Sequence, residues 1–112
     1  MREDGKIDYV EFPAADTGPV KAFYAAAFGW AFTDYGPDYV AFEGEGVDGG
    51  FTREPDVAMP LVILYAHDLE AMQAKVTGAG GVISKPIFAF PGGRRFHFRD
   101  PSGNELAVWS VS

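Results

Sequence analysis

Residues 10–16 read VEFPAAD, and residues 62–68, 52 positions later, read VILYAHD. The same offset places Gly29 on Gly81. Each copy has the pattern of a short strand, a capping aspartate, a helix and a terminating glycine, followed by further strand-like sequence. An internal repeat of this kind predicts two copies of one small structural unit. We therefore expect an α+β fold built from two βαβββ modules.

The repeat also predicts where the helices and several strands lie. Asp16 and Asp68 each stand where an N-cap belongs, which predicts helices near residues 16–28 and 68–79. In the first helix the apolar positions recur at spacings of three and four and define the expected buried face: Val20, Phe23, Tyr24, Ala27 and Phe28. In the second half we expect two short strands, at residues 82–84 and 87–89, around Pro86. Alternation predicts a strand at 94–99, which the turn DPSGN at residues 100–104 joins to the expected last strand at 105–109.

Length and composition indicate a single folded domain. The chain has 112 residues, of which 47% are hydrophobic, and this is ample for a packed core. We expect one domain over residues 1–112, with module one at about 6–55 and module two at about 60–112. The chain has no cysteine, which excludes disulfides, thiolate metal sites and a cysteine nucleophile.

Charge and hydropathy predict the location of the protein and the classes of partner that it lacks. A net charge of −7 argues against a nucleic-acid partner, which would require a basic face. No apolar run approaches the roughly 20 residues of a membrane span. Residues 1–6 are charged and lack the apolar stretch of a signal peptide. We therefore expect a soluble, cytoplasmic protein without a membrane or nucleic-acid partner.

Several short motifs together resemble a known family. They are Asp16, Phe23-Tyr24, Phe28-Gly29-Trp30, Gly80-Gly81 and the turn at residues 100–104. In this order and spacing they are similar to the vicinal oxygen chelate superfamily, which includes glyoxalase I, bleomycin-resistance proteins, fosfomycin-resistance enzymes and extradiol dioxygenases. Within it, the chain most resembles short glyoxalase-related proteins of unknown function. The resemblance implies two βαβββ modules that form a half-open barrel around a cavity.

The resemblance also implies positions for a metal site. Metal-dependent members hold a divalent ion through His and Glu side chains, and the matching positions here are Tyr9, the segment Gly49–Thr52, Leu61 and Ala107. Leucine and alanine cannot bind a metal, and a neutral tyrosine is a poor ligand. We therefore expect no metal and no other cofactor, which argues against lactoylglutathione lyase activity. Glu45 or Glu54 could support a non-standard site only with a shifted strand register.

Strand alternation selects the candidate site residues. Glu11 shares a face with Tyr9, Arg95 shares one with His97, and Trp109 shares one with Ala107. We expect ligand binding by Tyr9, Glu11, Arg95, His97 and Trp109 in one cavity. The resemblance adds that the fosfomycin-resistance branch makes a substrate contact at the position of His97. Purely structural roles for Glu11 and His97 are equally compatible with the sequence.

Three functions fit this set of residues. The first is a metal-independent small-molecule-binding protein with a mostly apolar pocket and a few placed polar groups. The alternative is a lyase or isomerase that acts on a small oxygenated metabolite, with Glu11 and His97 as catalytic acid and base. The third is a catalytically silent module that only assembles with other chains. We also expect a homodimer, because a half-open barrel leaves apolar sheet surface that a symmetric partner can cover.

Overall fold

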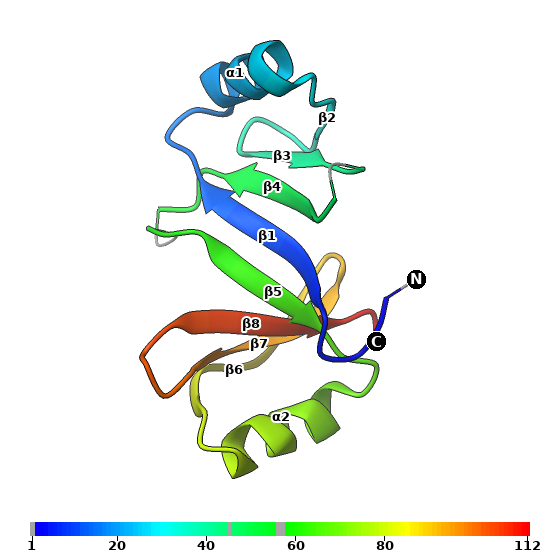
Figure 1. Ribbon diagram of the computed structural model, residues 1–112, viewed down its shortest axis with the longest axis vertical. Coiled ribbons are helices and arrows are strands. Elements are labelled where there is room, and N and C mark those ends of the chain that lie inside the picture. The colour runs from blue at the N-terminus through cyan, green and yellow to red at the C-terminus, as the bar shows by residue number, and fades with distance from the viewer. Residues whose placement is uncertain (1, 45, 56–57) are drawn as a thin grey trace. The chain divides into compact units, whose positions relative to one another are not determined.

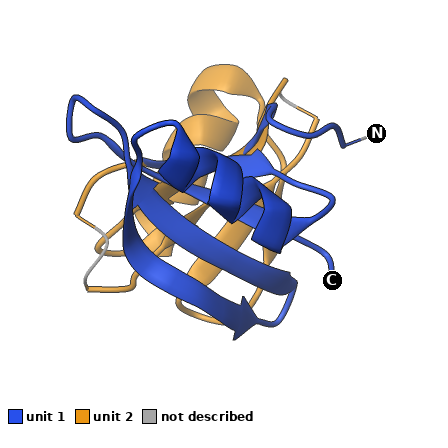
Figure 2. Cartoon of the chain, turned by 90° about the horizontal axis from the view of Figure 1, so that it is seen from below, with its two compact units in different colours: residues 1–8, 61–112 blue, residues 9–60 orange. Residues whose placement is uncertain are grey.

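The computed structural model describes residues 2–44, 46–55 and 58–112, and these residues divide into two compact units. Unit 2 comprises residues 9–60, and unit 1 comprises residues 1–8 with 61–112 (Figure 2). Each unit contains one helix and its own set of strands, and each is described separately. No helix in these three ranges has the length and apolar character needed to cross a membrane.

Unit 2 is built from one helix and four strands, which Figure 1 labels. The elements are β1 (Ile7–Pro13), α1 (Thr17–Phe28), β2 (Phe32–Asp34), β3 (Tyr39–Phe42) and β4 (Asp48–Thr52), and β1 enters this unit at Tyr9. The strand order is β1-β4-β3-β2. Strands β1 and β4 are parallel, whereas the other two pairs are antiparallel. The first strand of the unit therefore pairs with its last.

Unit 1 repeats this arrangement. Its elements are β5 (Leu61–Tyr65), α2 (Leu69–Gly78), β6 (Val82–Phe90), β7 (Gly93–Arg99) and β8 (Glu105–Ser110). The order is β5-β8-β7-β6, with β5 and β8 parallel and the remaining pairs antiparallel. The two units share one topology, which confirms the α+β fold of two βαβββ modules.

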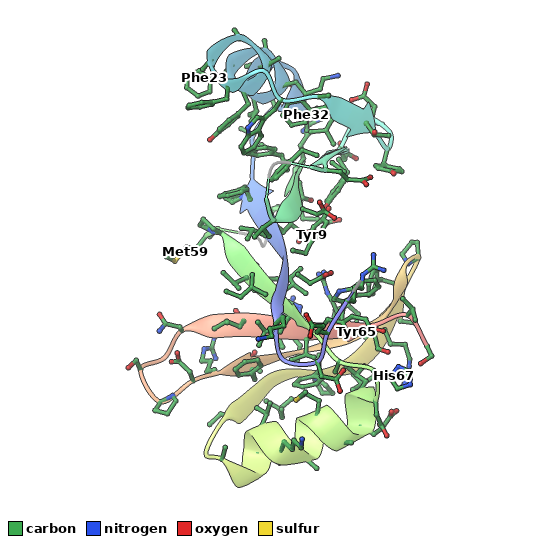
Figure 3. The ribbon with its side chains drawn as sticks, turned by 45° about the vertical axis from the view of Figure 1, so that its right-hand side comes forward. Tyr9, Phe23, Phe32, Met59, Tyr65 and His67 are labelled. Atoms are coloured by element: carbon green, nitrogen blue, oxygen red, sulfur yellow. The ribbon has the colours of Figure 1, made fainter. Side chains whose placement is uncertain are left out.

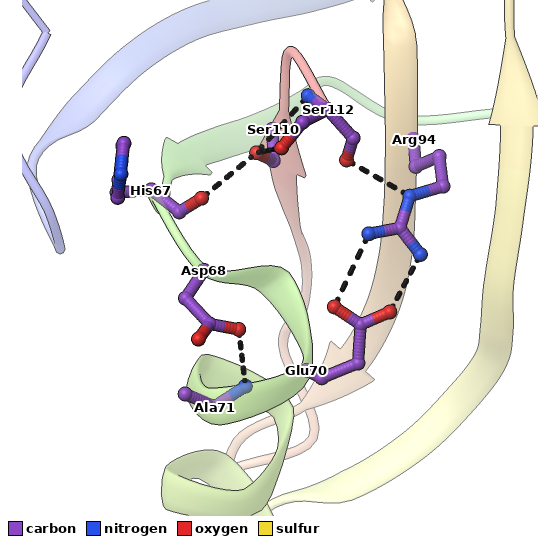
Figure 4. A network of polar contacts seen from close by, with 7 residues as sticks. All are labelled: His67, Asp68, Glu70, Ala71, Arg94, Ser110 and Ser112. Carbon is purple, nitrogen blue, oxygen red and sulfur yellow. Dashed lines mark hydrogen bonds and ion pairs between the residues drawn. The ribbon is translucent and has the colours of Figure 1, made fainter.

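The helices begin and end as the sequence predicts. Asp16 accepts a hydrogen bond from the backbone N–H of Gly18 at 3.2 Å, and Asp68 accepts one from Ala71 at 3.0 Å. Helix α1 ends at Gly29, whose φ of 75° lies in the left-handed region that favours glycine. Around the start of α2, Arg94 of β7 binds both carboxylate oxygens of Glu70 and the backbone oxygen of Ser112 (Figure 4). This exposed ion pair ties the helix to β7 and to the last residue.

In each unit the helix covers one face of the sheet. In unit 2 the core consists of Val40, Phe42 and Phe51, and Val20 and Tyr24 of α1 pack against it. The expected buried face of α1 is partly wrong, because Phe23 is 58% exposed and Phe28 is 63% exposed. Figure 3 labels Phe23 on α1. In unit 1 the core consists of Ala66, Leu69, Phe96 and Val108, with Met72 and Val76 of α2 packed on it. The opposite sheet face of each unit carries the candidate site residues.

Gly49 provides a test of the packing in unit 2. A Cβ at this position would lie 2.6 Å from Phe42 Cζ and closer still to the backbone oxygen of Val10 on the parallel strand β1. Because the backbone oxygen cannot move aside, we expect Gly49→Ala to lower the free energy of unfolding by about 1–3 kcal/mol, as overpacking does. Urea unfolding followed by circular dichroism measures the difference.

Gly18→Ala is the matched control for this substitution. Gly18 lies in the first turn of α1, and its Cβ would meet only Asp16 Oδ1, at an ordinary contact of 3.7 Å. Alanine has the higher helix propensity, so this variant should be as stable as the wild type or more so. Equal stability of the Gly49 and Gly18 variants would contradict the close approach of β1, β3 and β4.

Candidate functional site

A chain of three polar side chains lies on the sheet face of unit 2 opposite α1. The hydroxyl of Tyr39 donates a hydrogen bond to Glu11 Oε2 at 3.1 Å. The hydroxyls of Tyr9 and Tyr39 lie 2.5 Å apart. Since Tyr39 uses its only hydrogen on Glu11, Tyr9 must be the donor in the second bond. The sequence predicted Tyr9 and Glu11 on one face of β1, but it gave no reason to select Tyr39.

Gly50 allows this chain to form. Register places Gly50 of β4 between Glu11 of β1 and Ala41 of β3. Tyr39 lies two residues before Ala41 on β3, and its side chain reaches across Gly50 to β1. A Cβ on Gly50 would lie 2.7 Å from ring carbons of Tyr39 and closer still to its hydroxyl. The absence of a side chain at position 50 therefore creates the space that the phenol occupies.

The surroundings of these groups keep both phenols protonated. Glu11 is only 8% exposed, and it lies beside the two tyrosines. Burial raises the pKa of Tyr39 far above its usual value, and the nearby Glu11 raises it further. Burial likewise raises the pKa of Tyr9. Both side chains therefore act as neutral hydrogen-bond donors.

A second polar group lies on the sheet face of unit 1 opposite α2. Glu105 Oε2 lies 2.9 Å from Ser84 Oγ, which donates to it, and 3.3 Å from His97 Nδ1. These residues come from three adjacent strands, β8, β6 and β7. The ring of Phe88 lies against that of His97, with 5.7 Å between their centroids. The sequence predicted His97 on this face and missed Ser84.

Burial and positive charge keep His97 neutral. Its side chain is buried, and desolvation together with the charges of Arg95 and Lys85 lowers its pKa to about 4, against the opposing effect of Glu105. Burial opposes ionisation of Glu105, but the bond from Ser84 and the proximity of His97 and Arg99 keep its pKa below the usual value. At neutral pH the pair is therefore a carboxylate hydrogen-bonded to an uncharged imidazole.

Arg95 and Trp109 lie in an aromatic cluster on the same face of unit 1. The guanidinium of Arg95 lies 5.4 Å from the ring centre of Phe88 and 5.3 Å from that of Phe90, which is cation–π geometry. Trp109 Nε1 donates to Asp8 Oδ2 at 2.9 Å, and the guanidinium of Arg2 lies 4.9 Å over its ring. The N-terminal segment of unit 1 therefore covers the indole, a contact that the sequence did not indicate.

The structure thus places the five predicted residues in two groups. Tyr9 and Glu11 belong to unit 2, and Arg95, His97 and Trp109 belong to unit 1. Within each unit the predicted residues share a sheet face and contact one another or common neighbours. That all five line one cavity stays a prediction.

The positions that the resemblance assigns to a metal do not fit one. The Tyr9 hydroxyl is bonded to Tyr39, and Tyr39 also occupies the space over Gly50. Leu61 and Ala107 are buried and have no donor atom. Across residues 2–44, 46–55 and 58–112, no group of three or more His, Asp or Glu side chains could hold an ion. Glu54 is exposed, and Glu45 lies outside the described residues.

The topology is the same in both units, and polar groups lie on the sheet face opposite each helix. These features define a class of proteins that contain two βαβββ modules. The chain belongs to the Glyoxalase/Bleomycin resistance protein/Dioxygenase superfamily, whose family model matches residues 6–108. This match confirms the vicinal oxygen chelate relationship that the motifs indicated. No curated protein matches the chain.

Solved structures show the same fold at low sequence identity. A Legionella pneumophila protein described as an NAD-dependent benzaldehyde dehydrogenase is 15% identical, with a TM-score of 0.77 over 93% of this chain and 98% of its own. A superfamily member from Vibrio splendidus 12B01 is 16% identical, with a TM-score of 0.70 over 94% and 97%. The Mn(II)-bound glyoxalase from Novosphingobium aromaticivorans is 24% identical, with a TM-score of 0.71; the match covers 99% of this chain but only 40% of that one. At these identities the likeness shows the fold alone.

The raised pKa values of the phenols predict how stability changes in alkaline solution. Tyrosines in the unfolded chain ionise near pH 10, whereas Tyr39 keeps its proton in the folded state. Its contribution to stability is therefore complete below about pH 10 and is lost as the pH rises beyond it. Tyr39→Phe removes this contribution, so its free energy of unfolding should fall less steeply with pH, by up to about 1.4 kcal/mol per pH unit.

Urea unfolding of wild type and Tyr39→Phe at pH 7, 8 and at intervals from 9.5 to 11 tests this difference. The free energies of unfolding at pH 7 and 8 supply the control, because the difference between the two proteins there measures the pH-independent cost of losing two hydrogen bonds. Parallel stability curves for the two proteins above pH 10 would show that Tyr39 is not shielded from ionisation.

Proposed function

We propose that this chain binds a small molecule through its own side chains and without a glyoxalase-type metal ion. The observation that carries the proposal is the Tyr9–Tyr39–Glu11 chain over Gly50, which fills the place of a metal-ligating side chain on β4. The sheet faces opposite the helices carry aromatic rings and a few buried polar groups, which is the usual make-up of a ligand site. Tyr9, Glu11, Arg95, His97 and Trp109 are the ligand-binding residues in this proposal.

The alternative, a lyase or isomerase with Glu11 and His97 as acid and base, receives one specific support. His97 is buried, uncharged and fixed by Glu105, as a proton acceptor should be. However, a pKa of about 4 makes it a weak base near neutral pH, where an effective general base has a pKa close to the working pH. Ligand binding is therefore the stronger proposal. We also propose that the protein is cytoplasmic.

Two measurements test metal independence and ligand binding together. Elemental analysis of the dialysed protein should give no stoichiometric zinc, nickel or manganese. A thermal-shift screen of small oxygenated and aromatic compounds should yield stabilising ligands equally well with and without EDTA, because ligand that binds the folded state raises Tm. One metal ion per chain that is lost on mutation of Glu11, or hits that all vanish in EDTA, would overturn the proposal.

Glu11→Gln then tests the role of the buried carboxylate for any ligand that the screen identifies. The substitution keeps the shape of the side chain and removes its charge. We expect binding to weaken by roughly 1–3 kcal/mol, the scale of one hydrogen bond to a charged group. Glu54→Gln, which changes an exposed carboxylate, is the matched control and should leave affinity unchanged.

We also propose that the protein is a homodimer. Helix α1 supports this, because its only charged residue is Lys21 and it exposes Phe23 and Phe28. Beside it lies an apolar hollow of about 520 Å³, lined by Phe12, Pro13, Pro19, Val20, Phe23, Tyr24, Phe51 and Pro60. Exposed apolar surface of this kind often marks a contact with another chain.

Multi-angle light scattering at micromolar concentration tests the assembly. The expected mass is twice the 12.1 kDa of one chain. Phe23→Ser should lower it toward that of the monomer, while Val82→Ser, at an exposed apolar residue of β6, should not. A wild-type mass of one chain would contradict the dimer.

A further inference from the structure

We propose that Glu105 and Ser84 position His97 so that its Nε2 atom accepts a hydrogen bond from a hydroxyl group of a bound alcohol or phenol. This inference rests on the proposed small-molecule binding and specifies the ligand chemistry that unit 1 recognises. Glu105 and Ser84 are positioning residues, and His97 is the residue that contacts the ligand.

The bond between Glu105 and His97 determines where the imidazole proton lies. An ionised carboxylate can only accept hydrogen bonds, so the His97 Nδ1 atom facing Glu105 Oε2 must carry the hydrogen. Ser84 donates to the same oxygen at 2.9 Å and holds the carboxylate in place. In an uncharged ring the other nitrogen, Nε2, is then an acceptor with an available lone pair.

The Nε2 atom is buried and has no hydrogen-bond partner among the described residues. His97 is 4% exposed, so bulk solvent does not readily supply a partner. A buried polar atom without a partner costs about 1–3 kcal/mol, and such atoms in folded proteins call for an explanation. A ligand hydroxyl would remove this cost on binding.

The charges around His97 restrict the ligand further. Arg95 on the same strand and Lys85 on β6 are positive, Glu105 on β8 is negative, and Arg99 lies near Glu105. Positive charges on two sides disfavour an ammonium donor at Nε2, so the donor should be an uncharged hydroxyl. Phe88 packs on His97, and Phe88 and Phe90 both pack on Arg95, so the surroundings of the imidazole are partly aromatic, which suits a hydroxyl carried by an aromatic ring.

The irregular pairing of β6 with β7 supports a site whose side chains are specifically oriented. Its pairing with β7 shifts register between Ile83 and Lys85 and again between Lys85 and Phe88. Such bulges re-aim side chains and are over-represented next to functional sites. The first shift contains Ser84, the residue that binds Glu105, and the second precedes Phe88, the residue that packs on His97.

Nitrogen-15 NMR of the histidine rings tests the positioning step without any ligand. His67→Gln removes the other histidine signals and assigns those of His97. At pH 7 we expect the tautomer with hydrogen on Nδ1 in the wild type and in Ser84→Ala. Glu105→Gln should lose this single tautomer, because the glutamine amide can donate to Nδ1 as well as accept from it. Hydrogen on Nε2 in the wild type, or an unchanged tautomer in Glu105→Gln, would overturn the inference.

Phenol and anisole are the matched probes for the ligand step, since they share a ring and differ in the hydroxyl hydrogen. Titration of the wild type should shift the His97 Nε2 resonance with phenol and not with anisole, and phenol should bind about tenfold more tightly. His97→Phe should bind both equally. The tautomer of His97 is measured in the wild type. The inference can therefore be contradicted even if a variant fails to fold.

The outcomes separate this inference from the proposed function. Equal binding of phenol and anisole, or shifts confined to residues away from His97, would refute hydroxyl recognition while small-molecule binding stands. If neither compound shifts His97 at millimolar concentration, the inferred ligand class is wrong. The EDTA-resistant thermal-shift screen decides separately whether the protein binds small molecules at all.

Discussion

Each unit depends on the parallel pairing of its first and last strands, β1 with β4 and β5 with β8. Parallel neighbours cannot be joined by a tight turn, so the chain must cross over, and here it does so through one helix and an antiparallel meander. The helix covers one face of the sheet with apolar contacts. The opposite face is left for the hydroxyl, carboxylate and imidazole groups. This division of the two faces follows from the connection itself and is the same in both units.

The polar face of unit 2 carries two phenols beside the position where the family resemblance implies a metal-ligating side chain. A ligating side chain on β4 would need space above the strand, and Tyr39 fills that space because position 50 is glycine. The phenol then gives the buried Glu11 carboxylate a hydrogen bond from an uncharged donor. This bond favours the folded state, since burying a carboxylate is costly unless donors reach it.

The fold could be predicted from the sequence because its signals are local and repeated. Asp16 and Asp68 act as helix caps within three residues of the groups they bind. The site could be predicted only in part. Alternation placed Tyr9, Glu11, Arg95 and His97 on their faces, but Tyr39 and Ser84 meet their partners across strands 28 and 21 residues apart in sequence. The two expected strands around Pro86 are one strand, because register shifts let β6 continue past the proline.

The two polar faces differ in what they leave for a ligand. On unit 2 each hydroxyl of the chain is used, as Tyr9 donates to Tyr39 and Tyr39 donates to Glu11. On unit 1 the carboxylate of Glu105 is also bonded to a hydroxyl, but its second partner is a ring with another nitrogen on the far side. An imidazole transmits the orientation set at Nδ1 to an acceptor at Nε2, whereas a phenol bonded at its oxygen has no second polar atom. The same carboxylate chemistry therefore fixes the two phenol hydrogens in unit 2 and presents an acceptor nitrogen in unit 1.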